Sequence, residues 1–226
     1  MMSVDRTENM KIVPKHTELD RRVLLRTEVG SHMWRMATPQ SDHDFFEIFL
    51  FQTKHILIGC QPKSVCKHNP ELGVDLAAHE FGEAIHQLIK GNINFITGVN
   101  SPLLTFIRPD IELLRRSPEL YLSKRIGDSL FGMVDGNIGK YMRIEGKDTP
   151  RWTKLMRYLR FAEHLATDLS LRFEPCEKTW YDQLIEERKR IRELFYKSTV
   201  LPDNPSGELA LWELLLQVRI RDLGAD

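Results

Sequence analysis

The stretch that decides the fold is Val29–Phe51, which reads VGSHMWRMATPQSDHDFFEIFLF. It opens on a Gly-Ser pair, and the run before it, residues 22–29 (RVLLRTEV), is rich in leucine and β-branched residues. This pattern predicts a strand that enters a tight turn. The stretch ends on residues 44–51 (DFFEIFLF), which are nearly all apolar, as expected of a central strand with both faces covered. The sequence therefore predicts two strands joined by a Gly-Ser turn and a loop.

Two aspartates, Asp42 and Asp44, stand at the head of the second strand. Side chains two apart in a strand point to the same side, so the two carboxylates are expected to lie together. Their repulsion destabilises the fold unless a positive charge lies between them, and oxygen ligands suit Mg²⁺. Gly30 lets the backbone approach a ligand closely, while Ser31 and the neighbouring amides can bind phosphate oxygens. Together these residues predict a site for a metal-bound triphosphate, although an Asp-x-Asp pair alone is weak evidence because aspartate is common in turns.

The rest of the chain predicts an α+β fold. Residues 55–60 (HILIGC) read as another strand, residues 61–73 as a surface loop, and residues 74–78 (VDLAA) as a short strand. A helix follows from Glu80 and stops near Gly91. From residue 101 onward almost only helices are expected, with Ser123 and Asn204 as caps and Thr149-Pro150 as a further start. We therefore expect an α/β core over residues 1–100 and a helical domain over residues 101–226. The sequence leaves open whether the two halves share one hydrophobic core.

Composition limits the classes of partner. Lys plus Arg and Asp plus Glu both total 32 in the 226 residues, so no net charge indicates a nucleic-acid partner. A membrane partner is not expected, because no apolar run approaches the roughly 18 residues of a membrane span and no signal peptide is apparent. The three cysteines suit a reducing compartment, so a cytoplasmic protein is expected.

The order strand, Gly-Ser, ten residues, Asp-His-Asp and apolar strand resembles the signature of the nucleotidyltransferase superfamily related to DNA polymerase beta. GSHMWRMATPQSDHD is similar to the GS…GLATPxSDxD form of a group of predicted bacterial, archaeal and phage nucleotidyltransferases. VDLAAHEFGEAIHQLIKGNINFI, SPLL and KLMRYLRFAEHL resemble later segments of that group, so the resemblance covers most of the chain from about Leu24. Arg35 stands where a glycine is usual in the group, and Arg157 where a histidine is usual.

The resemblance implies a fold and a metal site. The fold is a small mixed β-sheet core, like the palm of polymerase beta, with a helical C-terminal half. Asp42 and Asp44 would hold two Mg²⁺ (or Mn²⁺) ions about 3.5 to 4 Å apart, which clamp the attacking and leaving oxygens. A third carboxylate on an adjacent strand normally completes the site and helps to deprotonate the acceptor hydroxyl, and Asp75 is the candidate.

The resemblance also implies a nucleotide site. Gly30 and Ser31 would hold the β- and γ-phosphates of a nucleoside triphosphate, and Lys154 with Arg157 or Arg160 would supply positive charge to the leaving pyrophosphate. The implied enzyme transfers a nucleotide monophosphate to an acceptor hydroxyl. RNA ends, protein side chains and small molecules all stay open as the acceptor.

Each assignment has an alternative. Asp75 could simply end a loop and cap the following helix, and Lys154 and Arg160 could form the solvated face of an amphipathic helix. The whole chain could be a catalytically inactive nucleotide-binding or regulatory partner protein. The complete set of Asp42, Asp44 and Asp75 favours the enzyme, because a degenerate copy would tend to lose one of them.

Overall fold

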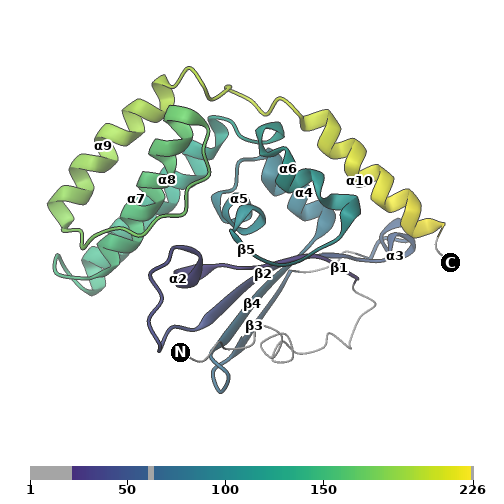
Figure 1. Ribbon diagram of the computed structural model, residues 1–226, viewed down its shortest axis with the longest axis horizontal. Coiled ribbons are helices and arrows are strands. Elements are labelled where there is room, and N and C mark those ends of the chain that lie inside the picture. Colours follow the sequence, from purple (N-terminus) through teal and green to yellow (C-terminus); the bar gives the residue numbers. More distant parts are fainter. Residues whose placement is uncertain (1–21, 61–63, 225–226) are drawn as a thin grey trace, which may run out of the picture.

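A five-stranded mixed sheet forms the centre of the computed structural model, which describes residues 22–60 and 64–224 (Figure 1). The strand order is β3-β4-β2-β1-β5. The central β2–β4 pair is parallel, and the pairs β1–β2, β1–β5 and β3–β4 are antiparallel. The strands are β1 (Arg22–Glu28), β2 (His43–Leu50), β3 (Val65–Asn69), β4 (Val74–Glu80) and β5 (Leu103–Ile107).

Helices cover one face of this sheet and extend beyond one of its ends (Figure 1). Helices α4, α5 and α6 lie over the sheet, α10 runs beside them, and α7, α8 and α9 pack together as a bundle. The helices are α2 (Gly30–Met33), α3 (Thr53–Leu57), α4 (Phe81–Ile89), α5 (Ile93–Asn100), α6 (Leu113–Arg116), α7 (Arg125–Ile144), α8 (Arg151–Asp168), α9 (Tyr181–Lys197) and α10 (Glu208–Leu223), with short 3₁₀ helices at Pro109–Ile111 and Pro118–Leu120. The α+β prediction is confirmed. No helix in the described part of the chain is both long and apolar enough to cross a membrane.

The strand predictions around the Gly-Ser turn are confirmed. β1 and β2 pair with Glu28 opposite Phe45, and β2 is buried from Phe46 to Leu50, as its apolar sequence predicts. Glu47, the charged residue in the buried part of β2, is also buried, and the guanidinium of Arg26 donates a hydrogen bond of 2.8 Å to its carboxylate. A buried carboxylate needs such a partner to be tolerated in the core.

Three other predictions were wrong. The apolar run at residues 55–60 is not a strand: helix α3 spans Thr53–Leu57, and Leu57 and Ile58 are left exposed to solvent. The predicted loop at residues 61–73 contains β3, and the predicted all-helical half contains β5. Both are short edge strands with largely exposed side chains. β3 (VCKHN) is mostly polar, whereas β5 (LLTFI) is apolar but only five residues long and lies among predicted helices.

Two predicted caps were also wrong. Ser123 is buried with its hydroxyl unpaired among the described residues, and α7 begins two positions later. Asn204 accepts a hydrogen bond from Arg125 (3.1 Å) instead of capping α10, which begins after Gly207. The start of α8 directly after Pro150 agrees with the prediction.

The hydrophobic core runs through both halves of the chain. One cluster contains Leu25 and Ile48 of the sheet together with helical residues as far as Val218. The last helix returns to the N-terminal half, where Arg219 donates to the carbonyl of Phe51 (2.7 Å). The boundary predicted near residue 100 falls between α5 and β5, and the division into two domains stays a prediction.

Candidate active site

The Gly-Ser turn brings the backbone against one of the predicted carboxylates. The N–H of Val29 donates to the carbonyl of Asp44 (2.7 Å), and Gly30 has a φ of +65°. A Cβ at Gly30 would collide with the carboxylate of Asp44. Glycine is therefore required here both by the left-handed backbone and by the close approach. Ser31 follows at once in α2, and its carbonyl accepts from the N–H of Met36 (2.9 Å), which closes the turn.

Asp44 and Asp75 lie side by side in the parallel β2–β4 register. Paired residues on neighbouring strands project to the same face of the sheet, so the two carboxylates point the same way. Asp42, at the start of β2, lies beside Gly73, where a Cβ would stand 3.1 Å from its Oδ1. Burial raises the pKa of Asp44, and the charges of Asp75 and Asp42 raise it further. The structure thus brings the three predicted carboxylates together.

Two of these carboxylates, Asp42 and Asp44, carry negative charge that basic side chains do not neutralise closely. Among residues 22–60 and 64–224, neither Asp42 nor Asp44 forms a hydrogen bond or an ion pair through its side chain, and the only opposing charge near Asp44 is that of His32. Oxygen donors gathered in this way match the ligand preference of Mg²⁺ and Mn²⁺.

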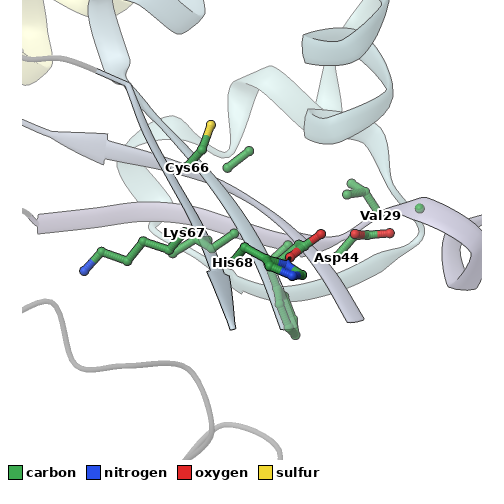
Figure 2. A pocket seen from close by; sticks show the side chains of 10 residues that line it. Val29, Asp44, Cys66, Lys67 and His68 are labelled. Carbon is green, nitrogen blue, oxygen red and sulfur yellow. Dashed lines mark hydrogen bonds and ion pairs between the residues drawn. The ribbon is translucent and has the colours of Figure 1, made fainter. Parts of the chain in front are cut away.

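An open pocket of about 430 Å³ lies at the carboxylates (Figure 2). Its lining includes Gly30, Asp44 and Asp75 together with Cys66, Lys67 and His68 of β3. His68 is hydrogen-bonded through Nδ1 to Oδ1 of Asp75, and this bond, with the charge of Asp75, raises the pKa of His68. The Lys67 side chain points away from Asp44 in Figure 2. Sequence reasoning missed His68 because it placed this segment in a loop.

Arg157 is the predicted basic residue that lies nearest the Gly-Ser loop. Its side chain is buried, its guanidinium carbon lies 5.4 Å from the ring centre of Trp34, and its Nη1 is 3.8 Å from the sulfur of Met36. Burial lowers the pKa of Arg157, and no carboxylate pairs with it in the described part of the chain. Its neighbour Tyr158 packs edge-on against the ring of Trp34, with ring centroids 5.3 Å apart, so this segment of α8 lies beside the Gly-Ser loop.

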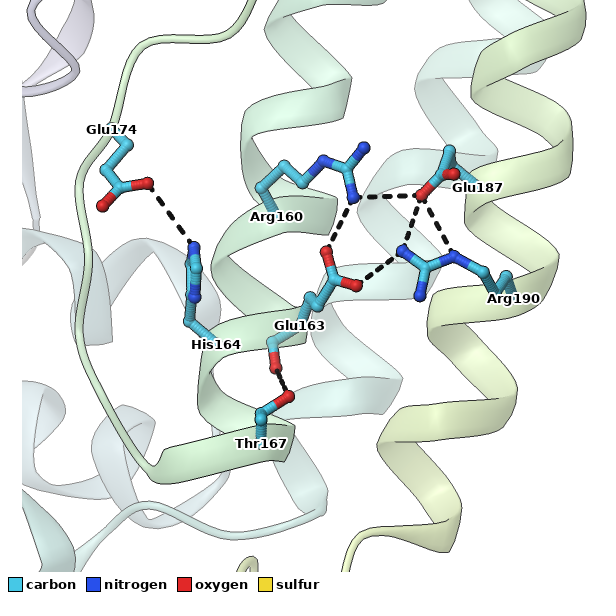
Figure 3. A network of polar contacts seen from close by, with 7 residues as sticks. All are labelled: Arg160, Glu163, His164, Thr167, Glu174, Glu187 and Arg190. Atoms are coloured by element: carbon cyan, nitrogen blue, oxygen red, sulfur yellow. Dashed lines mark hydrogen bonds and ion pairs between the residues drawn. The ribbon is translucent and has the colours of Figure 1, made fainter.

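Lys154 and Arg160 occupy different surroundings. Lys154 is exposed on the first turn of α8. Arg160 belongs to a network of charges between α8 and α9, where its Nη1 lies 2.7 Å from Glu163 and 3.1 Å from Glu187 (Figure 3). Arg190 completes this network. The guanidinium of Arg160 is thus already compensated, whereas that of Arg157 is not.

A second polar group lies beside the turn and was not identified from the sequence. Glu28, His32 and His43 each offer one ligand atom, and these atoms lie within 4.8 Å of one another. Glu28 ends β1, His32 lies in α2, and His43 begins β2. The sequence signal was a histidine on each side of the loop, but only the β1–β2 register shows that both meet Glu28.

The sequence is similar to that of a family of known proteins. The sequence model of an RNA repair pathway DNA polymerase beta family (RlaP) matches residues 2–172, a range that includes the carboxylates and α8. A crystal structure of a nucleotidyltransferase-like protein from Exiguobacterium sibiricum 255-15 is 15% identical, over 90% of this chain and 72% of that one, with a TM-score of 0.33. No curated protein matches the chain.

Proposed function

The chain belongs to the RNA repair pathway DNA polymerase beta family and is a nucleotidyltransferase, and from this premise we propose that it moves a nucleoside monophosphate from a nucleoside triphosphate to an acceptor hydroxyl with release of pyrophosphate. The observation that carries the proposal is the convergence of Asp42, Asp44 and Asp75 around the glycine of the Gly-Ser turn. The reading of the chain as an inactive binding protein is disfavoured because no member of this carboxylate set is missing.

The three carboxylates fit a divalent cation. They supply only oxygen donors, which divalent cations such as Mg²⁺ prefer. Burial and the negative charges of Asp75 and Asp42 raise the pKa of Asp44, and a bound cation would relieve the repulsion among the three carboxylates. We assign Asp42, Asp44 and Asp75 as the residues that hold Mg²⁺ or Mn²⁺. When bound, two such ions would supply the positive charge that attacking and leaving oxygens need in an in-line displacement.

The Gly-Ser turn binds the triphosphate, and the edge strand β3 positions the carboxylate that deprotonates the acceptor. Gly30 brings its backbone against the carboxylates without a side chain in the way, so the β- and γ-phosphates can approach Gly30 and Ser31. On the other side, His68 holds Oδ1 of Asp75 and fixes the orientation of that carboxylate. Asp75 then accepts the proton of the acceptor hydroxyl through its other oxygen, Oδ2.

Positive charge for the leaving pyrophosphate comes from α8. Arg157 is the strongest candidate, because a buried guanidinium without a carboxylate partner has donors left for an anion. Lys154 is exposed on the same helix, and we propose it as a second source of positive charge. Arg160 can contribute only if it leaves Glu163 or Glu187. The pyrophosphate site therefore centres on Arg157.

The acceptor class that the family description supports is RNA, so we propose an RNA end as the acceptor hydroxyl. The test is transfer of label from each of the four α-labelled nucleoside triphosphates, with Mg²⁺ or Mn²⁺, to RNA with a free end, and in parallel to protein and small-molecule fractions. Asp44→Asn and Asp75→Asn should each lower the rate at least about a hundredfold. Asp203→Asn is the matched control, because this aspartate is exposed in the loop before α10.

The outcomes separate the alternatives. Label in RNA that depends on Asp44 and Asp75 supports both the reaction and the acceptor. Label in another fraction with the same dependence keeps the reaction and replaces the acceptor. Triphosphate binding without transfer to any fraction, at rates equal to those of Asp44→Asn, would reject the enzyme in favour of a nucleotide-binding protein.

A further inference from the structure

Glu28 and His43 lie on the face of the β1–β2 pair opposite to that of Asp44, and His32 of α2 lies beside them. Neighbouring side chains of a strand point to opposite faces, so His43 points away from the face that carries Asp44. Glu28 is paired with Phe45 in the β1–β2 register and therefore shares the face of His43. This group is thus distinct from the site of nucleotidyl transfer, although both adjoin the same turn.

The distances within the group match those around a small metal ion. Oε1 of Glu28 lies 2.6 Å from Nδ1 of His43 and 3.6 Å from Nδ1 of His32. Two ligands placed 2.0 to 2.1 Å from a tetrahedral ion are about 3.4 Å apart. The His32 distance already has this value, and the His43 hydrogen bond would need to open by less than about 1 Å.

His32 lacks the partners that an imidazole usually has. Its Nε2 is buried without a hydrogen-bond partner, and its Nδ1 is too far from Glu28 for a hydrogen bond, within the described part of the chain. Its ring stacks on that of His43, with centroids 4.4 Å apart and planes at 18°. Lone pairs of stacked rings run nearly parallel, so one imidazole must turn about its Cβ–Cγ bond before both rings face a single ion. Two imidazoles with one carboxylate are then a common ligand set for a metal.

We propose that Glu28, His32 and His43 bind one divalent transition-metal ion of the Zn²⁺ class, separately from Mg²⁺ at the carboxylates. Two nitrogens and one oxygen suit Zn²⁺, whereas Mg²⁺ prefers oxygen ligands alone. The side chains are 18%, 25% and 41% exposed, so an ion can enter and water can take the fourth position. The ion ties the end of β1 and the start of β2 to α2, and so stabilises the Gly-Ser turn.

The test uses the full chain carrying Asp42→Asn and Asp44→Asn, so that the carboxylate site cannot contribute. Co²⁺ is titrated in and its visible absorption followed, and Zn²⁺ is then titrated against a chromophoric chelator. We expect one equivalent of tight binding. His32→Ala, His43→Ala and Glu28→Gln should each weaken it at least about tenfold, and His86→Ala on α4 serves as the control. Circular dichroism establishes first that each variant is folded, and Glu28→Gln is the nearly isosteric variant if an alanine variant is not.

Binding that survives His32→Ala and His43→Ala would overturn the proposal. So would binding that is present in the unmodified chain but absent after Asp42→Asn and Asp44→Asn, because the ion would then occupy the carboxylates. As a second readout, Zn²⁺ should raise the melting temperature of the starting protein by a few degrees and leave that of His32→Ala unchanged. Neither readout depends on nucleotidyl transfer, so this proposal and the proposed function can fail separately.

Discussion

Replacing Gly30 by alanine separates the two roles of this glycine, its left-handed backbone and its contact with Asp44. A left-handed φ costs an alanine about 1 to 2 kcal/mol of stability. In addition, the new Cβ would collide with the Asp44 carboxylate and displace it. A displacement of about 1 Å at a reacting centre lowers the rate about a hundredfold, which corresponds to about 2.7 kcal/mol of activation free energy. We expect Gly30→Ala to show both losses.

Gly146 provides the matched control. Its φ is +70°, close to the +65° of Gly30, but a Cβ at this position would meet no atom within 4 Å. Gly146→Ala should therefore lose similar stability in denaturant unfolding and retain full nucleotidyl transfer. The measurements are the free energy of unfolding and kcat/KM for the triphosphate in both variants. If Gly30→Ala keeps kcat/KM within about threefold of the unmodified enzyme, the close approach at Asp44 is not needed for activity and the reasoning is wrong.

Three further predictions concern stability and the pyrophosphate site. Burial and two neighbouring carboxylates raise the pKa of Asp44 in the folded protein, so its ionisation opposes folding as pH rises through that value. In metal-free protein, Asp44→Asn should therefore raise the free energy of unfolding at pH 7, and this gain should shrink toward pH 4. Urea unfolding measures it, and a loss of stability at pH 7 would contradict the prediction. Thr27→Val removes a buried 2.7 Å hydrogen bond to the carbonyl of Gly98 and should cost about 1 to 2 kcal/mol in the same assay, whereas an unchanged midpoint would show that this bond contributes nothing. Arg157→Met should weaken inhibition by pyrophosphate at least about tenfold. Arg160→Met should weaken it less, because the guanidinium of Arg160 is already paired with Glu163 and Glu187. Equal effects of the two substitutions would contradict the assignment of Arg157.

The elements that could be predicted are those whose signal is local in the sequence. β1, β2 and β4 carry apolar runs, and α4 and α9 carry helical apolar periodicity. The period of a strand predicted Asp42 beside Asp44, although β2 begins at His43 and Asp42 lies just before it. Asp75 was chosen because it lies in the short apolar run before the helix that follows Glu80, and its position opposite Asp44 depends on a strand register that spacing alone does not give.

The elements and contacts that could not be predicted depend on residues that are distant in the sequence but close in the folded chain. β3 and β5 are edge strands of five residues whose side chains are largely exposed. β3, which is mostly polar, reads as loop, and β5, which is apolar but short, reads as part of a helical region. Consequently His68 could not be placed against Asp75. The resemblance did show Arg35 where a glycine is usual, and the structure supplies the reason, because Arg35 has a φ of +56°.

Strand pairing, and not distance along the chain, fixes the spacing of Asp44 and Asp75. The connection between them holds α3 and β3, and its length does not enter the β2–β4 register. Between Gly30 and Asp44 the situation is different, because a backbone hydrogen bond and a close contact join the two ends of that shorter loop. Evolution can therefore insert or remove residues between α3 and β3 while keeping the chemistry, and related enzymes should vary most in length there.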